Sequence, residues 1–192
     1  MKKCKNPFIY GGKITGDAFC DRNQEITELI EDIRSRQHVI MYSQRRFGKT
    51  SLVLKVLEEV RGHGIIPVYV DLYPVSTVSE FIEEYAKAIA RALTPYEKAV
   101  QLMRGLFTRL TLSMGVDGAG NPQWNVGFDR SRLSDSFEEV LFSLEHYLKK
   151  RKQFGVVVFD EFQQITELDG PKTERRLRSA LQTHEKICYF FV

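Results

Sequence analysis

The strongest constraint on the fold of this chain comes from residues 43–50, which read Ser43-Gln44-Arg45-Arg46-Phe47-Gly48-Lys49-Thr50. An apolar run at 38–42 precedes this segment and predicts a short buried strand, and residues 51–57 predict a helix. A strand, a loop, Gly-Lys-Thr and a helix in this order are typical of a phosphate-binding P-loop. The segment therefore predicts an α/β fold that binds a nucleotide.

The chemistry of such a loop explains its residue types. Backbone N–H groups at the start of the helix face phosphate oxygens, and the helix dipole favours their negative charge. Gly48 allows close approach and an unusual backbone dihedral, Lys49 supplies a charge for the β- and γ-phosphates, and Thr50 supplies a hydroxyl ligand for Mg²⁺. Ser43 stands where the general motif has its first glycine. The predicted nucleotide-binding residues are Ser43, Gln44, Arg45, Arg46, Phe47, Gly48, Lys49, Thr50 and Ser51.

A second element has the pattern of a Walker B strand. Residues 155–159 are apolar and are followed by Asp160 and Glu161. Adjacent carboxylates at the end of a buried strand are costly unless they face a cation or water. Asp160 is therefore predicted to bind Mg²⁺ together with Thr50. Glu161 and Lys49 are the predicted catalytic residues, and Glu161 is expected to polarise the attacking water.

The bulk properties set further limits. A length of 192 residues suits one domain, 1–192, and a net charge of +3 does not by itself indicate nucleic-acid binding. The cysteines, Cys4, Cys20 and Cys188, lack metal-ligand spacing and favour a reduced, cytoplasmic protein. No signal peptide and no run of membrane-spanning length is visible, so no membrane association is expected.

Along the chain, strand and helix patterns alternate, which predicts a parallel sheet. Residues 1–20 are expected to be an irregular arm. Thr77 and Glu80 form a capping box that predicts a helix to about residue 93. An inserted β-hairpin is expected at about 110–128. A helix capped by Asp21 is expected to carry an apolar stripe of Ile26, Leu29, Ile30 and Ile33. The remaining predictions are helices at about 95–110, 134–150 and 171–185 and strands at 65–72 and 187–192.

Several motifs together resemble the archaeal-type ATPase family. They are Asn6-Pro7-Phe8, Phe19 with Asp21-Arg22 and Glu25, residues 45–52, Val70-Asp71-Leu72 and Asp160-Glu161-Phe162. These proteins are AAA-like P-loop ATPases related to signal-transduction ATPases and, more distantly, to origin-recognition initiators. The resemblance implies a P-loop NTPase three-layer sandwich.

In such a fold one strand lies between the P-loop strand and the Walker B strand, and residues 187–192 are expected to form it. A fifth strand and a helical lid would follow in the family, and neither is visible. The chain is therefore expected to be C-terminally truncated.

The same resemblance places Phe19, Cys20, Asp21 and Arg22 near the adenine. Arg45 and Arg46 either contact phosphate or brace the loop against Asp160 or Glu161. On the helix at 171–185, an arginine is either a finger for a neighbouring subunit's nucleotide or part of a solvated face, and the solvated face is favoured.

The predicted function is Mg-ATP binding and hydrolysis, used as a conformational switch or motor coupled to a C-terminal domain. ATP is implied by the resemblance, and no guanine-reading Asn-Lys-x-Asp motif is present. Alternatives are a nucleotide-binding regulatory scaffold with little hydrolysis and a DNA-associated ATPase. A protein partner or a homo-oligomer is compatible with each of these three functions. DNA binding is not supported by these residues, because no helix-turn-helix or comparable reader is visible.

Overall fold

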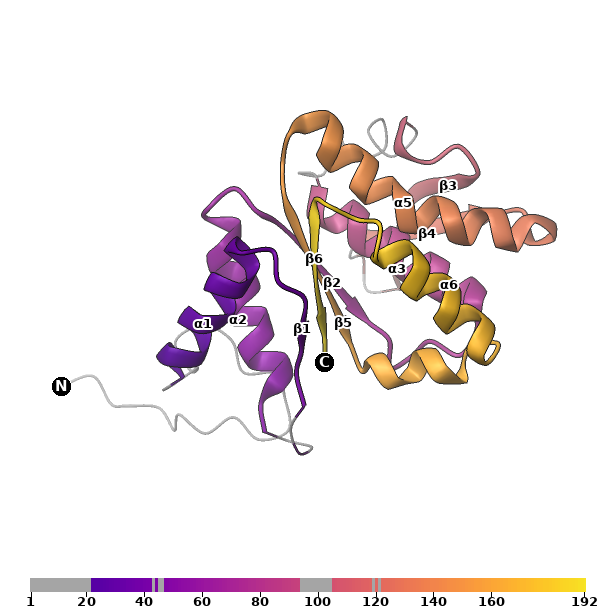
Figure 1. The fold of residues 1–192 in the computed structure, drawn as a ribbon. Helices are drawn as coiled ribbons and strands as arrows, with labels where there is room; N and C mark the ends of the chain where they lie inside the picture. Colours follow the sequence, from indigo (N-terminus) through magenta and orange to yellow (C-terminus); the bar gives the residue numbers. More distant parts are fainter. Residues whose placement is uncertain (1–21, 43, 45–46, 94–104, 119, 121) are drawn as a thin grey trace.

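The computed structural model describes residues 22–42, 44, 47–93, 105–118, 120 and 122–192. Its centre is a parallel four-stranded sheet in the order β1-β6-β5-β2 (Figure 1). The strands are β1 (Val39–Ile40), β2 (Ile66–Asp71), β5 (Gly155–Asp160) and β6 (Ile187–Phe191). The predicted order, with β6 between the P-loop strand and the Walker B strand, is confirmed.

The apolar runs explain the central strands. Every residue of β5 is buried, as expected for a strand covered on both faces. In β6 only Phe191 is partly exposed. β5 pairs along its length with β2 on one side and with β6 on the other.

Two helices cover one face of the sheet (Figure 1). They are α1 (Asn23–Arg34) and α2 (Lys49–Arg61). The predicted apolar stripe of α1 is buried there and includes Ile33. It packs in one cluster with α2 and with the residues of β5 and β6 that point to this face, Val156, Val158, Cys188 and Phe190.

In the described part of the chain, three helices cover the other face, which completes the three-layer sandwich (Figure 1). They are α3 (Val78–Leu93), α5 (Leu133–Arg151) and α6 (Pro171–Leu181). The capping box is confirmed, because the Glu80 N–H donates to Thr77 Oγ1 and the Thr77 N–H donates to Glu80 Oε2. Short 3-10 helices span Arg130–Arg132 and Phe162–Glu167.

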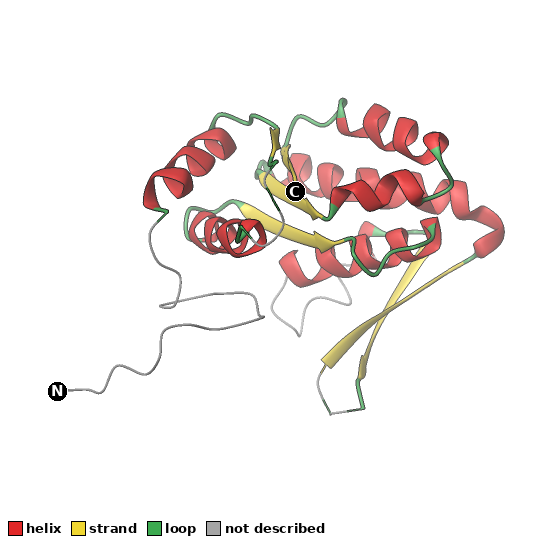
Figure 2. Ribbon diagram, turned by 90° about the horizontal axis from the view of Figure 1, so that it is seen from below, coloured by secondary structure: helices red, strands yellow, loops and turns green. Residues whose placement is uncertain are grey.

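The inserted hairpin is also confirmed and stands apart from the main sheet (Figure 2). Strands β3 (Leu110–Val116) and β4 (Pro122–Phe128) pair in antiparallel fashion. One face of the hairpin joins the core on the α3 side through Leu110, Leu112 and Trp124. Trp124 therefore serves as a packing residue.

Two predictions were wrong in detail. The strand expected at 38–42 is only two residues long, and Ile40 and Tyr42 are 81% and 99% exposed. β1 is an edge strand paired only with β6 in the described sheet, so an apolar sequence did not ensure burial. The last helix ends at Leu181, not near residue 185, because the Glu145 carboxylate accepts the N–H groups of Glu185 and Lys186 in a turn.

The arm at 1–20 and most of the helix expected at 95–110 lie outside the described residues. Within the described part of the chain, the helices are too short or too polar to cross a membrane.

Candidate functional site

The P-loop joins β1 to α2 through a left-handed glycine. Gly48 is the N-cap of α2 and has φ 70° and ψ 23°, as the sequence predicted. Residues with a Cβ rarely adopt this conformation. Lys49, Thr50 and Ser51 form the first turn of α2, where backbone N–H groups lack helical partners and can bind an anion. Gln44 and Phe47 are exposed, whereas Ser43, Arg45 and Arg46 lie outside the described residues.

Thr50 connects this helix to the Walker B strand. Its hydroxyl donates to Asp160 Oδ2 over 2.8 Å, across 110 residues of sequence. Asp160 is the last residue of β5 and is only 5% exposed. The structure therefore brings together the two residues that the sequence predicted as metal ligands.

Asp160 has a further partner that the sequence analysis missed. The hydroxyl of Tyr69, on β2, donates to Asp160 Oδ2 over 2.6 Å. Burial, and then the hydrogen bond to Asp160, raise the pKa of Tyr69 far above its ordinary value. Strand alternation could have placed Tyr69 on a face of the sheet, but only the sheet order reveals that β2 lies beside β5.

Glu161 follows β5 in an unusual conformation. Its φ of 55° and ψ of 43° are left-handed, which is uncommon for a residue with a side chain. Its backbone N–H donates to Asp160 Oδ1 over 3.1 Å, and its carboxylate accepts a hydrogen bond from Gln163 Nε2. The strand thus ends sharply, and the two acidic side chains have different partners. The predicted roles of Glu161 and Lys49 in catalysis stay predictions.

Of the four residues expected near the adenine, the structure describes only Arg22. Its Nη1 donates to the carbonyl oxygen of Phe47 over 3.1 Å, and its guanidinium pairs with Glu25. Arg22 therefore contacts the P-loop directly. Phe19, Cys20 and Asp21 lie outside the described residues.

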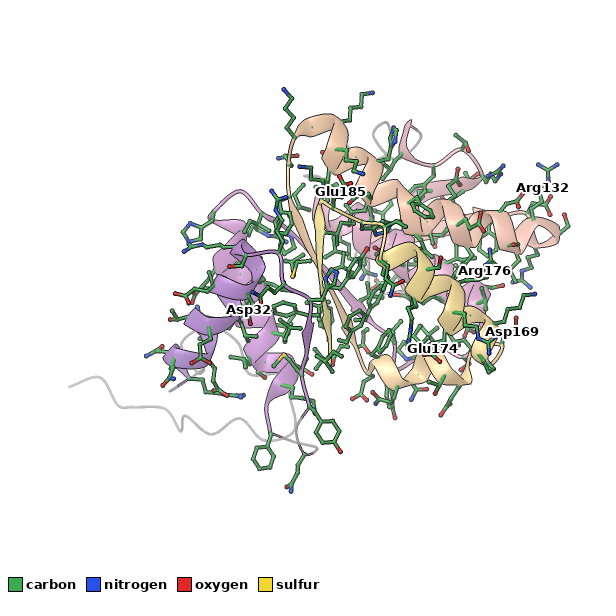
Figure 3. All side chains as sticks on the ribbon, viewed as in Figure 1. Asp32, Arg132, Asp169, Glu174, Arg176 and Glu185 are labelled. Atoms are coloured by element: carbon green, nitrogen blue, oxygen red, sulfur yellow. The ribbon has the colours of Figure 1, made fainter. Side chains whose placement is uncertain are left out.

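Helix α6, which carries Arg176, lies on the other side of the sheet from α1 and α2 (Figure 3). Arg176 pairs with Glu138 over 3.0 Å and its guanidinium stacks over the Phe137 ring, 5.1 Å from its centroid. Arg178 pairs with Glu174. These arginines pair within the chain, which is compatible with the solvated face that the sequence analysis favoured over an arginine finger.

The donor set suits a magnesium ion that arrives with a nucleotide. Among the described residues no group of three His, Cys, Asp or Glu side chains could hold a metal. Mg²⁺ commonly uses one or two protein oxygens and completes its shell with phosphates and water. The hydroxyl of Thr50 and the carboxylate of Asp160 fit this pattern.

The fold and the site together define a P-loop ATPase. The fold of the chain is similar to that of solved Walker-type ATPases. The model of the family described as "ATPase domain predominantly from Archaea" matches residues 19–185, and the chain belongs to that family. No curated protein sequence matches the chain.

Two solved structures illustrate the shared fold. The Walker-type ATPase of Pyrococcus abyssi has a TM-score of 0.58 at 16% identity, over 97% of this chain and 48% of that chain. The ORC1 protein of Aeropyrum pernix, in complex with DNA, has a TM-score of 0.52 at 17% identity, over 92% of this chain and 39% of that chain. The chain thus spans less than half the length of either protein.

Proposed function

We propose that this domain binds Mg-ATP and hydrolyses it, and that the change on hydrolysis acts as a switch or motor for a C-terminal domain of the whole protein. Membership of the ATPase family supports ATP binding at the general level. The observation that carries the proposal is the hydrogen bond from Thr50 to Asp160, which joins the P-loop helix to the Walker B strand.

Each residue has a separate task in this proposal. The N-terminal turn of α2 and Lys49 bind and orient the phosphates, and Thr50 and Asp160 would hold Mg²⁺. The metal, when bound, supplies charge that stabilises the transferring phosphoryl group. Glu161 accepts a proton from the attacking water, after its carboxylate leaves Gln163.

Nucleotide binding is tested with Lys49→Ala. Removing this charge is expected to weaken Mg-ATP binding by about 10- to 100-fold, since hydrogen bonds to charged groups contribute about 1.5–3 kcal/mol. Isothermal titration calorimetry measures the affinity. Lys55→Ala is the matched control, because Lys55 lies on the same helix and pairs with Glu58. Equal affinities for wild type and Lys49→Ala would refute a phosphate-binding role for Lys49.

Hydrolysis is tested with Glu161→Gln, which is expected to keep nucleotide affinity and lower turnover by about 10²- to 10⁴-fold. Glu167→Gln, an exposed position two turns along the following 3-10 helix, is the control. Unchanged phosphate release would rule out Glu161 as the base.

A regulatory scaffold with little hydrolysis is the second candidate. The hydrogen bond between Glu161 and Gln163 favours it, because Gln163 occupies one oxygen of the carboxylate that hydrolysis would need as a base. Nucleotide binding by the wild type without phosphate release would support this candidate. A DNA-associated role has only the shared fold with a DNA-bound protein in its favour, so we do not propose it.

A further inference from the structure

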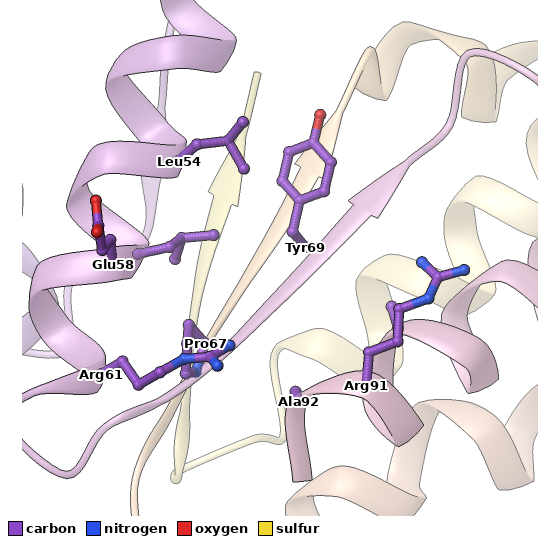
Figure 4. Close-up of a pocket in the computed structure, with 9 residues that line it drawn as sticks. Leu54, Glu58, Arg61, Pro67, Tyr69, Arg91 and Ala92 are labelled. Carbon is purple, nitrogen blue, oxygen red and sulfur yellow. The ribbon is translucent and has the colours of Figure 1, made fainter. Parts of the chain in front are cut away.

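The Tyr69 hydroxyl reaches Asp160 because of the register between β2 and β5. Tyr69 pairs with Val158, and Asp71 pairs with Asp160, so Tyr69 lies two residues before Asp160 along the sheet. Tyr69 packs against the same cluster as Val158, on the α2 face. Figure 4 shows its hydroxyl directed toward the carboxyl ends of the strands. The ring thus spans the gap between a strand interior and the predicted metal site.

Among the described residues, donors from three different segments hold Asp160. Its Oδ2 accepts from Thr50 and Tyr69, and its Oδ1 accepts from the backbone N–H of Glu161. Thr50 belongs to the P-loop helix, and the Glu161 N–H belongs to the turn that follows β5. Tyr69 is the donor that comes from β2, the strand paired with β5.

The chemistry of the tyrosine fits this role. A half-buried hydroxyl is costly unless it is hydrogen-bonded, and a phenylalanine would pack at this position without that cost. The Tyr69 hydroxyl carries a proton near neutral pH, as tyrosine ordinarily does, and it donates that proton to the Asp160 carboxylate over 2.6 Å. Partners of this kind orient metal-binding carboxylates, and their loss commonly lowers metal affinity by about 10- to 100-fold.

We propose that Tyr69 is a positioning residue that fixes the Asp160 carboxylate in the orientation that binds the Mg²⁺ of a Mg-nucleotide complex. This inference rests on the proposed function. Tyr69 acts through Asp160 and does not itself contact the nucleotide. Its contribution is therefore confined to the part of nucleotide affinity that depends on magnesium.

The surroundings of Tyr69 allow a clean test. The ring lines a groove of about 380 Å³ between α2 and α3, beside Leu54, Pro67 and Ala92 (Figure 4). Because one side of the ring faces this groove, Tyr69→Phe removes the hydroxyl without emptying a closed core site. Tyr147→Phe is the matched control, since Tyr147 lies on α5, where it packs under Arg151.

The measurement is the affinity for a non-hydrolysable ATP analogue, by calorimetry, once in EDTA and once with saturating Mg²⁺. The ratio of the two dissociation constants gives the gain in nucleotide affinity that is due to magnesium. Tyr69→Phe is expected to keep the affinity in EDTA and to reduce this gain about tenfold. Tyr147→Phe is expected to leave both values unchanged. In an Asp160→Asn background, Tyr69→Phe is expected to add no further loss, because the two residues act as one unit.

The possible results separate the two proposals. A wild-type chain that does not bind the analogue overturns the proposed function and this inference with it. A normal magnesium gain in both wild type and Tyr69→Phe overturns only the role of Tyr69. An equal loss of affinity in EDTA and in Mg²⁺ also overturns it, because that pattern reports a general structural effect.

Discussion

The left-handed conformation of Gly48 leads to a prediction that separates stability from binding. A Cβ placed on Gly48 would meet only Arg22 Nη1, at 3.8 Å, which is an ordinary contact. The cost of Gly48→Ala therefore comes from the backbone dihedral and amounts to about 1–2 kcal/mol. In a domain of this size, each kcal/mol lowers the melting temperature by about 2–4 °C.

Gly64 provides a matched control at the opposite end of α2. Its φ of 76° is almost the same, and a Cβ there would meet nothing within 4 Å. Gly64→Ala is therefore expected to lose the same stability. Only Gly48→Ala is expected also to weaken nucleotide binding, by about tenfold or more, because relaxation to a negative φ turns the first N–H groups of α2 away from the phosphates.

Differential scanning fluorimetry gives the melting temperatures, and calorimetry with Mg-ATP gives the affinities. The reasoning is refuted if Gly48→Ala binds as tightly as the wild type while melting earlier. It is equally refuted if Gly64→Ala loses as much affinity as Gly48→Ala, because the loss would then reflect α2 as a whole.

Three further predictions concern stability, measured by urea denaturation. Glu145→Ala should cost about 1–3 kcal/mol, because it removes the acceptor for two partly buried backbone N–H groups; no change in the midpoint would contradict this. Thr77→Ala should cost about 1 kcal/mol through loss of its bond to the Glu80 N–H, and an unaltered midpoint would argue against the cap. Burial lowers the pKa of His184 below its ordinary 6.5, so the unfolded chain binds more protons and stability should fall as the pH drops below about 6.5. His184→Gln should reduce this slope and the exposed His63→Gln should not; equal slopes would contradict the assignment.

The sequence was sufficient for the sheet and for most of its covering helices. Strand β5 and strand β6 are continuous apolar runs, which is typical of strands buried on both faces. Helix α3 has a complete capping box and an apolar stripe, so its start was predictable to within one residue. Ile40 is exposed because β1 is an edge strand in the described sheet, and hydrophobicity alone does not distinguish an edge strand from a central one.

The candidate site was predictable in its motifs but not in its contacts. The order of the P-loop and the Walker B pair was enough to predict that Thr50 and Asp160 meet. Tyr69 could not be found, because its contact depends on which strand lies next to β5. The left-handed turn at Glu161 was also not predictable, since glutamate has no preference for positive φ.

The position of β6 in the sheet has a consequence for how the site is assembled on a growing chain. β6 follows β5 in sequence, yet it lies between β1 and β5. A ribosome must therefore complete β6 before the P-loop strand can be joined to the Walker B strand. Pairings of such long sequence separation form slowly, because their loops must close first. Before this step, helices α1 and α2 and the hairpin can form locally, but the two halves of the nucleotide site are not yet connected by the sheet. A chaperone or nucleotide that acts during synthesis would meet a separate P-loop segment first and a complete site only after β6 has emerged.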